Sequence, residues 1–523
     1  MTVHTRIAKA SFVLIAASVL GHALSLAKEV VVANYFGITR SMDAYYTALT
    51  IPNLVNNIFL SPFTIIFIPI YIQFRLSDKE VADTLASILA NAIIAVLLAA
   101  SLLMILLSRP IISLSFPGLG AETSALTVGL FNVICVSLAF SGLAVILTGL
   151  INACESFLWP ALSQMLITLS TIFFVVFFAR KWGAYVFAWG LLAGALLQCV
   201  FLYPVAARCG YRHRWKLRLS DPRLRSTRNS FLFFVLLTLV SGLAPFINRT
   251  MASWLPVGSI AALGLADKLF QVPLIIFSGS VVTATYPFFS AQIAENRIDE
   301  MKNTLATSLK MCGFLFIPMT MILIVLAKPL IELLFQRGAF DAQATALTSV
   351  VFACCSLQLL SIYAMALMQR ILFILQELPG ILKLSALSVV MTIALNYLFI
   401  KTITPPAAGI AMSASAVCLL ISLLYFALLK RKVGALHGLS IVKSLGKTAA
   451  FSLVSAGAVF LLFRELDGAF AYSKWTRGAN LIGSGACGVL VFAALTLLFK
   501  TDESKKVRDL ARMQLEKLFG AAA

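Results

Sequence analysis

Charged residues are scarce in this sequence. Of its 523 residues, 12% are Asp, Glu, Lys or Arg and 60% are hydrophobic, whereas an ordinary soluble domain has about 25% charged residues. Long polar stretches are also lacking, which leaves no room for a soluble catalytic domain between the apolar segments. The composition predicts a protein that is embedded in a membrane along its whole length.

Patterns that carry catalysis or hold metals are missing as well. The four histidines are scattered without an HExxH pattern, no P-loop for nucleotide binding occurs, and the nine cysteines show no CxxC spacing. We therefore expect a protein that is not an enzyme, with no catalytic residue, no metal site and no cofactor. ATP hydrolysis within this chain is not expected, while coupling to an ion gradient or to the membrane potential remains open.

The net charge of +20 does not point to nucleic acid, because the basic residues border apolar segments and form no folded basic face. We expect these residues to set the membrane topology next to anionic lipids. They gather between the sixth and seventh apolar segments and after the twelfth. Both loops and both termini are thus predicted on the cytoplasmic side of a bacterial inner membrane.

Fourteen apolar segments are long enough to span a bilayer, for which a helix needs about 20 residues. Their centres lie near residues 18, 58, 93, 138, 168, 193, 243, 275, 315, 355, 390, 418, 455 and 490. The first begins with Arg6 and Lys9 and imitates a signal peptide, but because thirteen more follow we interpret it as a retained helix. The sequence thus predicts an all-α membrane protein with fourteen transmembrane helices.

A basic stretch between the sixth and seventh segments predicts the division of the chain. Two six-helix lobes around a central cavity are a common transporter plan, with the binding site near the midplane. The predicted parts are an N-terminal lobe (1–208), a basic cytoplasmic linker (209–230), a C-terminal lobe (231–430), two further spans (431–500) and an amphipathic cytoplasmic tail (501–523). A faint repeat supports two related halves, because AYYTALTIP at 44–52 resembles LADKLFQVP at 265–273.

Charged residues occur deep inside three of the apolar segments. Lys28 and Glu29 lie in the first, Arg249 in the seventh, and Asp267 and Lys268 in the eighth. A charge near the bilayer centre costs roughly 3 kcal/mol, so such residues usually mark a pathway or a binding site. The three deep cations suit an anionic group such as a diphosphate, which a guanidinium holds with two hydrogen bonds and an ammonium as a point charge.

Two alternatives to an anionic site remain open from the residues alone. The lysine and glutamate of the first segment are neighbours and could form a structural ion pair, although adjacent helix positions point about 100° apart. Asp43 and Asp267 could also pair permanently with the deep cations. The second segment adds Asn53 and Asn56, uncharged groups of the kind that hydrogen-bond sugar hydroxyls or peptide amides.

Four stretches resemble the MurJ (MviN) lipid II flippases of the MOP exporter superfamily. They are AKEVVVANYFGITRSMDAYYTALTIPN at 27–53, ADKLFQVP at 266–273, KPLIELLFQRGAFDAQAT at 328–345 and QRILFILQELP at 369–379. The resemblance covers nearly the whole chain. It implies that the protein flips an undecaprenyl-diphosphate-linked peptidoglycan precursor across the inner membrane by alternating access, with the cell-wall synthesis machinery as a further expected partner.

The resemblance also implies a cationic central cavity, with arginines on the first, second and eighth helices and an aspartate on the second. Matched to this sequence, the first-helix cation is Lys28, the aspartate is Asp43 and the eighth-helix cation is Lys268. The second-helix arginine pair is absent, since Asn56 and Asn57 occupy those positions. The residues expected to bind the diphosphate thus differ from the family pattern. Another polyprenyl-diphosphate-linked saccharide, such as an exopolysaccharide repeat unit, is therefore an alternative cargo.

The leading hypothesis is therefore a lipid II flippase that binds the diphosphate on Lys28, Lys268 and Arg249. Asp43 is also expected among the substrate-binding residues, where it would orient the lysines, and Asn53 and Asn56 would meet the headgroup. Glu29 and Asp267 would be the charge partners in the cavity.

Other classes of function fit the sequence less well. A membrane glycosyltransferase would need a catalytic acid or base and a large external loop, and a multidrug exporter for cationic drugs would need an acidic cavity. The sodium site of some family members has little support, because Thr392 and Asn396 offer oxygens without an acidic residue on their helix.

Overall fold

The computed structural model describes residues 3–77, 79–209, 211, 228–278, 281–469, 474–506, 508 and 509. Nearly all of the predicted linker at 209–230 and most of the predicted tail at 501–523 lie outside the described residues. The described residues are helical apart from short turns, and no strand occurs among them. A helix satisfies its backbone hydrogen bonds within itself, as a segment in hydrocarbon must.

The described part of the chain contains eleven helices long and apolar enough to cross a membrane. They are 86–106, 121–153, 158–182, 185–208, 232–252, 298–325, 342–374, 378–402, 406–433, 438–467 and 475–498. Each coincides with one of the fourteen predicted segments. The protein is thus a multi-pass membrane protein with an all-α fold, as predicted, and the count of fourteen stays a prediction. The three remaining segments, near residues 18, 58 and 275, lie in the helices that carry most of the deep charges.

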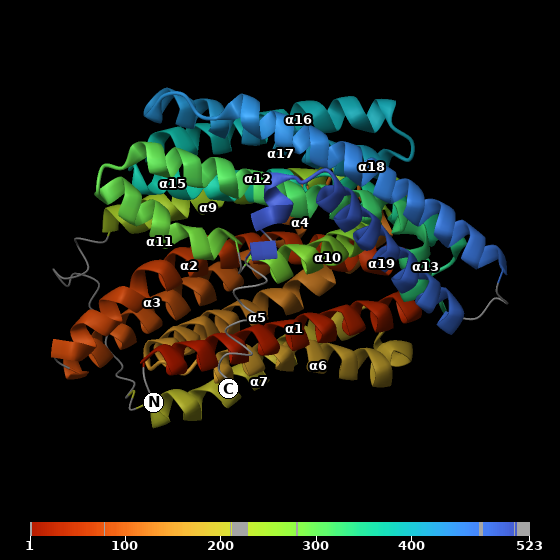
Figure 1. Ribbon diagram of the computed structural model, residues 1–523. Coiled ribbons are helices and arrows are strands. Elements are labelled where there is room, and N and C mark those ends of the chain that lie inside the picture. The colour runs from red at the N-terminus through yellow and green to blue at the C-terminus, as the bar shows by residue number, and fades with distance from the viewer. Residues whose placement is uncertain are drawn as a thin grey trace. The chain divides into compact units, whose positions relative to one another are not determined.

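The chain folds into two compact units. The first contains Met1–Lys268 and Arg337–Ala344, and the second contains Leu269–Gln336 and Thr345–Ala523. The helices of the first unit are α1 (Val3–Phe36), α2 (Arg40–Ser77), α3 (Lys79–Leu106), α4 (Ser108–Ser115), α5 (Ala121–Ala153), α6 (Leu158–Trp182), α7 (Tyr185–Arg208), α9 (Arg228–Ala252) and the first half of α10 (Ser259–Ser278) (Figure 1). The lobe boundaries expected from the sequence stay a prediction.

The second unit holds the rest of α10 and all later helices. These are α11 (Val281–Ala294), α12 (Ile298–Val325), α13 (Ala327–Phe335), α14 (Ala342–Ser356, from Thr345 onward), α15 (Leu359–Ile374), α16 (Leu378–Thr402), α17 (Pro406–Val433), α18 (Gly438–Ala469) and α19 (Lys474–Leu498). Here α12 packs against α11, α15 and α18, while α17 packs against α15 and α16. The rings of Phe316 on α12 and Tyr363 on α15 stack with centroids 4.0 Å apart.

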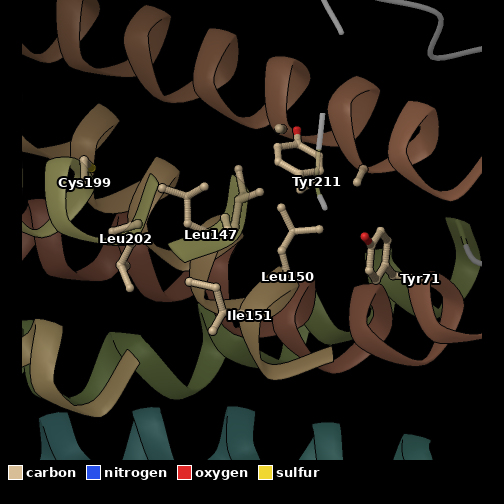
Figure 2. Packing of buried hydrophobic residues seen from close by; sticks show 12 residues of the cluster. Tyr71, Leu147, Leu150, Ile151, Cys199, Leu202 and Tyr211 are labelled. Carbon is tan, nitrogen blue, oxygen red and sulfur yellow. The ribbon is translucent and has the colours of Figure 1, made fainter. Parts of the chain in front are cut away.

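The core of the first unit is built around α5, which packs against α2, α3 and α7. Figure 2 shows its side chains, including Leu147, Leu150 and Ile151, meeting Leu202 of α7 and Tyr71 of α2. All of these side chains are buried. The second helix is thereby fixed along one face, and it is this helix that presents the aspartate and tyrosine described below.

Small residues allow the closest helix contacts in the first unit. A Cβ on Gly190 of α7 would lie 2.8 Å from the Cα of Thr171 on α6, and one on Gly194 would lie 2.5 Å from the Cα of Ile167. Because real Cβ atoms do not approach so closely, these positions require glycine. Membrane helices associate through such small residues, since lipid is as apolar as their side chains.

Three connections meet at one end of the first unit. The backbone N–H of Ala339 donates to the carbonyl of Asn34 at the end of α1, over 2.9 Å. Gly37 approaches Ala339, Gly258 approaches Ile38, and both glycines have positive φ, which suits a residue without a Cβ. The GAFDA segment at 338–342, part of the resembling stretch 328–345, therefore packs against the turn between α1 and α2. This contact fixes where α1 ends and α2 begins.

Candidate functional site

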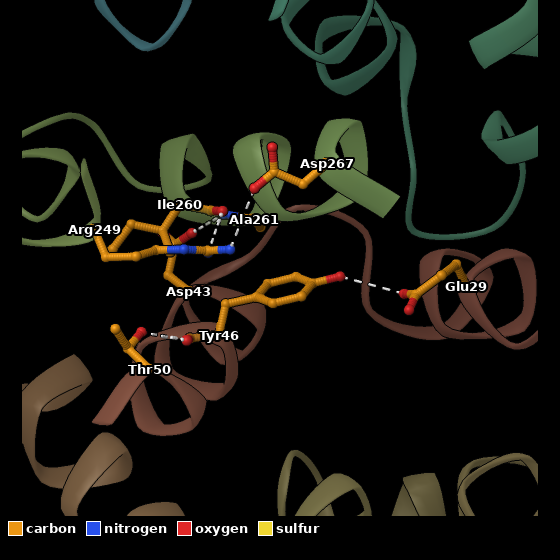
Figure 3. Close-up of polar contacts among 8 residues, drawn as sticks. All are labelled: Glu29, Asp43, Tyr46, Thr50, Arg249, Ile260, Ala261 and Asp267. Carbon is orange, nitrogen blue, oxygen red and sulfur yellow. Dashed lines mark hydrogen bonds and ion pairs between the residues drawn. The ribbon is translucent and has the colours of Figure 1, made fainter. Parts of the chain in front are cut away.

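The buried ion pair of the first helix, Lys28 and Glu29, is joined by a third residue, Tyr46. The Nζ of Lys28 lies 2.9 Å from Oε1 of Glu29. The hydroxyl of Tyr46 on α2 donates to the other carboxylate oxygen, Oε2, over 3.2 Å (Figure 3). The Glu29 side chain is 4% exposed and that of Lys28 17% exposed. The ion-pair alternative for these neighbours is therefore realised in this conformation, and Tyr46 holds the carboxylate from a second helix.

Asp43 belongs to α2, but its carboxylate binds the N-terminus of another helix, α10. Its two carboxylate oxygens accept hydrogen bonds from the backbone N–H groups of Gly258, over 2.6 Å, and Ala261, over 2.7 Å. Gly258 immediately precedes α10 and Ala261 lies in its first turn, where backbone donors have no partner within the helix. A carboxylate there is also favoured by the positive end of the helix dipole. Asp43 thus caps α10 from α2, and is 95% buried while doing so.

Arg249 on α9 is held by three groups. Its Nη1 donates to the carbonyl of Ile260 over 3.2 Å, its Nη2 lies 3.8 Å from Oδ2 of Asp267, and its guanidinium lies 5.2 Å from the centre of the Tyr46 ring. Figure 3 shows the side chain extended between α2 and α10. A guanidinium that stacks on a ring and donates to a carbonyl joins the helices it touches. One of its five N–H donors forms a hydrogen bond to the protein, and its charge is partly balanced by Asp267.

Lys268 is the most exposed of the three deep cations. It interacts electrostatically with Lys28, Glu29, Asp267 and Arg249, so the structure brings the charged positions of α1, α9 and α10 together. Within the described part of the chain no carboxylate forms an ion pair with Lys268. Three cations and two carboxylates give this group, which we call the charge cluster, one net positive charge.

The two asparagines of α2 lie farther along that helix. Asn53 is seven residues beyond Tyr46, about 10 Å at the helical rise of 1.5 Å per residue. Its side chain is exposed, while the side-chain oxygen Oδ1 of Asn56 is buried without a hydrogen-bond partner. Among the described residues no hydrogen bond joins either asparagine to the charge cluster.

The sequence did not lead us to Tyr46, which contacts both Glu29 and Arg249 of the charge cluster. It lies three residues after Asp43, on the same face of α2, so its spacing was the available signal. Its ring also packs against Gly264 of α10, where a Cβ would lie 2.9 Å from three ring carbons. The tight fit means that Tyr46 sets how closely α2 and α10 approach.

The proposed oxygen ligands of α16 are both buried. The hydroxyl of Thr392 donates to the carbonyl of Ser388 over 2.8 Å, so it is engaged within its own helix. The part of the chain that the structure describes contains no group of three His, Cys, Asp or Glu residues able to hold a metal ion.

The sequence of the chain matches a known protein family. The chain matches the family model described as "Lipid II flippase MurJ" over residues 32–477. It belongs to this family. Curated relatives include the probable lipid II flippase MurJ of Vibrio cholerae, 26% identical over 95% of this chain and 97% of that protein. Another is that of Rhizobium tropici, 24% identical over 93% of this chain and 92% of that protein.

Solved structures agree on the fold. A lipid II flippase MurJ in an inward closed conformation matches with a TM-score of 0.77 and 22% identity, covering 96% of this chain and all of that one. An inward-facing MATE transporter of the MOP superfamily matches with a TM-score of 0.67 and 14% identity, covering 82% and 96% of the two chains. The MurJ family consists of transporters, so this chain is a transporter and not an enzyme, as predicted.

Proposed function

We propose that this protein flips lipid II from the cytoplasmic to the outer leaflet of a bacterial inner membrane, with both termini in the cytoplasm. Family membership supports a lipid-linked cell-wall precursor as the cargo. The observation that carries the proposal is the charge cluster. Its deep cations on α1 and α10 suit the diphosphate that links headgroup to polyprenyl chain, and such cations are retained in a membrane mainly where they serve a pathway.

The contacts suggest an exchange of partners. Lys268 is exposed and has no ion-pair partner among the described residues, so the diphosphate would meet this lysine first. Lys28 is held by Glu29 at 2.9 Å, and a second phosphate oxygen would compete with that carboxylate. Release would restore the ion pair, which keeps Lys28 compensated when the site is empty. Rocking of the two predicted lobes would then move the headgroup while the polyprenyl tail stays in lipid.

Arg249 takes a different part from the one that sequence suggested. Because it is stacked on Tyr46 and bound to Ile260 and Asp267, we propose that it fixes α9, α10 and α2 around the site. It contributes positive potential to the cargo without a bidentate grip. Asp43 likewise shapes the site by capping α10, which positions Lys268 three turns further along.

A second polyprenyl-diphosphate-linked saccharide, such as an exopolysaccharide repeat unit, remains the runner-up. The observation in its favour is Asn56, whose buried side-chain oxygen has no hydrogen-bond partner among the described residues, at a position where the resemblance to the family places an arginine. An amide there reads hydroxyls or amides of a headgroup instead of phosphate charge. The two cargoes share the diphosphate, so the cluster alone serves both.

Complementation distinguishes the two cargoes. The lipid II flippase of a host bacterium is depleted, this chain is expressed, and viability is followed together with the access of an impermeant reagent to lipid II in intact cells. Lipid II transport predicts rescue of growth and of external lipid II. Failure of rescue, with loss of surface polysaccharide when Lys28 is replaced in the native host, would favour the runner-up.

The binding residues are tested in liposomes that contain the purified full chain and fluorescent lipid II. Lys28→Ala and Lys268→Ala should each slow flipping roughly 10- to 100-fold, the size expected for one hydrogen bond between charged groups. Lys28→Arg should retain activity, and Lys328→Ala, which removes an exposed lysine outside the cluster, is the matched control. Full activity of both Lys28→Arg and Lys28→Ala would show that this charge does not hold the cargo.

A further inference from the structure

A hollow lined by cations lies in the second unit, where α12, the first turns of α18 and the segment after α19 meet. Its volume is about 750 Å³, within the range of about 300–1,000 Å³ usual for ligand pockets. Its lining includes Lys310 of α12, ten of the residues between 436 and 451, and residues 499–503. The transport site proposed above uses none of these residues, and we call this hollow the α12–α18 pocket.

Positive charge dominates the α12–α18 pocket. Lys310, Lys443, Lys447 and Lys500 line it, against the two carboxylates Asp502 and Glu503. Glu503 is buried and accepts a hydrogen bond from the hydroxyl of Ser444 over 2.6 Å. Lys310 donates to the hydroxyl of Ser440 over 2.7 Å. Across the described residues none of the four lysines forms an ion pair with a carboxylate, so the pocket carries a net charge of two that no side chain offsets.

A smaller hollow of about 280 Å³ adjoins the pocket. It shares Lys310, Asp502 and Glu503 with it and adds Lys505 and Lys506. Lys506 lies against α12, where its Nζ donates to the hydroxyl of Thr307 over 3.3 Å. The basic surface therefore continues from α18 across the segment after α19 to α12.

Part of the pocket wall is apolar. Phe451 of α18 stacks on Phe499 with ring centroids 5.1 Å apart. Phe499 is 66% exposed, and the adjacent Leu439, Val442 and Leu498 are also exposed. In a membrane-spanning helix such side chains face lipid. A ligand that binds both the lysines and these apolar side chains has a phosphate at one end and hydrocarbon chains at the other.

We propose that the α12–α18 pocket binds the headgroup of an anionic phospholipid, with its acyl chains along the exposed apolar side chains of α18 and the end of α19. Lysine ammonium groups attract a phosphate as point charges and tolerate several headgroup positions. Basic pockets between transmembrane helices are suited to such headgroups. The N-terminus of the 32-residue helix α18, which begins at Gly438 in the pocket wall, adds the favourable end of a helix dipole.

The proposal is tested with the full chain purified in a zwitterionic detergent. Short-chain phosphatidylglycerol is titrated in, and the bound lipid is counted by native mass spectrometry, with phosphatidylcholine and glycerol 3-phosphate as comparison ligands. Each basic residue near an anionic lipid surface strengthens binding about fivefold. The double variant Lys443→Gln/Lys447→Gln should thus lose roughly 30-fold in affinity for phosphatidylglycerol while its melting temperature stays unchanged, because both side chains are exposed.

The matched control is Lys328→Gln/Lys401→Gln, which removes two exposed lysines of the second unit that lie outside the pocket. It should bind phosphatidylglycerol as the wild type does. An equal loss in this control would mean dispersed surface charge and would overturn the proposal, as would equal affinity of the wild type for phosphatidylcholine. Glycerol 3-phosphate that displaces the lipid at similar concentration would identify a soluble phosphate ligand and also overturn it.

Discussion

Replacement of Asp43 separates a structural role from a transport role at a position where sequence resemblance expects a cavity aspartate. In the structure its carboxylate accepts from the N–H groups of Gly258 and Ala261 at 2.6 and 2.7 Å. Loss of an N-cap costs about 0.5–2 kcal/mol in measured series. Asp43 is 95% buried, so no water replaces the carboxylate, and each of the two freed N–H groups then costs about 1–2 kcal/mol, the loss of the cap included.

We therefore expect Asp43→Ala to destabilise the protein by roughly 2–4 kcal/mol and Asp43→Asn by about 1 kcal/mol, since one amide oxygen still caps the helix. Melting temperatures of the purified chain in detergent, and flipping rates of the same preparations, provide the measurement. Stability and flipping should fall together, in the order wild type, Asn, Ala. The control is Asp299→Asn, whose side chain is 93% exposed and pairs with Lys302 over 2.9 Å.

One result would refute the reasoning. If Asp43→Ala melts at the wild-type temperature and yet fails to transport, the carboxylate acts on the cargo and the cap contributes nothing measurable. If Asp43→Asn is as inactive as Asp43→Ala but as stable as the wild type, charge and not capping is what transport needs. Either outcome would return Asp43 to the list of cargo-binding residues.

Three further substitutions test contacts that the fold depends on, each read from the melting temperature in detergent. Tyr46→Phe should lower stability by about 1 kcal/mol, because it loses the hydrogen bond to Glu29 but keeps the ring beneath the guanidinium; no change would show that this bond is not formed in solution. Gly264→Ala should cost about 1–3 kcal/mol, since its Cβ would lie 2.9 Å from the Tyr46 ring, and an unaffected variant would contradict the close approach. Arg477→Gln should destabilise the second unit by roughly 1–3 kcal/mol, because it leaves the partly buried Glu332 without its cation, whereas an unchanged melting temperature would show a dispensable pair.

Hydrophobic periodicity and residue type were sufficient to predict the helices. All eleven apolar helices of the described residues coincide with predicted segments, because twenty apolar residues in a row have few alternatives to a spanning helix. The positions of Lys28 in α1, Arg249 in α9 and Lys268 in α10 also followed from sequence. The depth of each of these residues along its helix follows from its position in the sequence, because a helix rises by about 1.5 Å per residue.

The partners of these charges could not be counted in the same way. Asp43 binds N–H groups 215 and 218 residues away, and no local pattern reports such a contact. Asp267 and Lys268 are neighbours on α10, yet one reaches Arg249 and the other is exposed. Which neighbour each of two adjacent side chains meets depends on the rotation of the helix against the helices around it, which periodicity leaves undetermined by a few tens of degrees.

The faint internal repeat acquires a physical meaning from Arg249. When AYYTALTIP at 44–52 is aligned with LADKLFQVP at 265–273, Tyr46 and Asp267 occupy the same position. In the structure both contact the same guanidinium, one through its ring and the other through its carboxylate. Two equivalent sites of the repeat thus converge on one cation. Of the three deep cations, Lys268 is exposed and forms no ion pair among the described residues, whereas Lys28 is bound to Glu29 and Arg249 lies near Asp267. An anionic cargo would therefore meet Lys268 first and would gain Lys28 at the expense of its bond to Glu29.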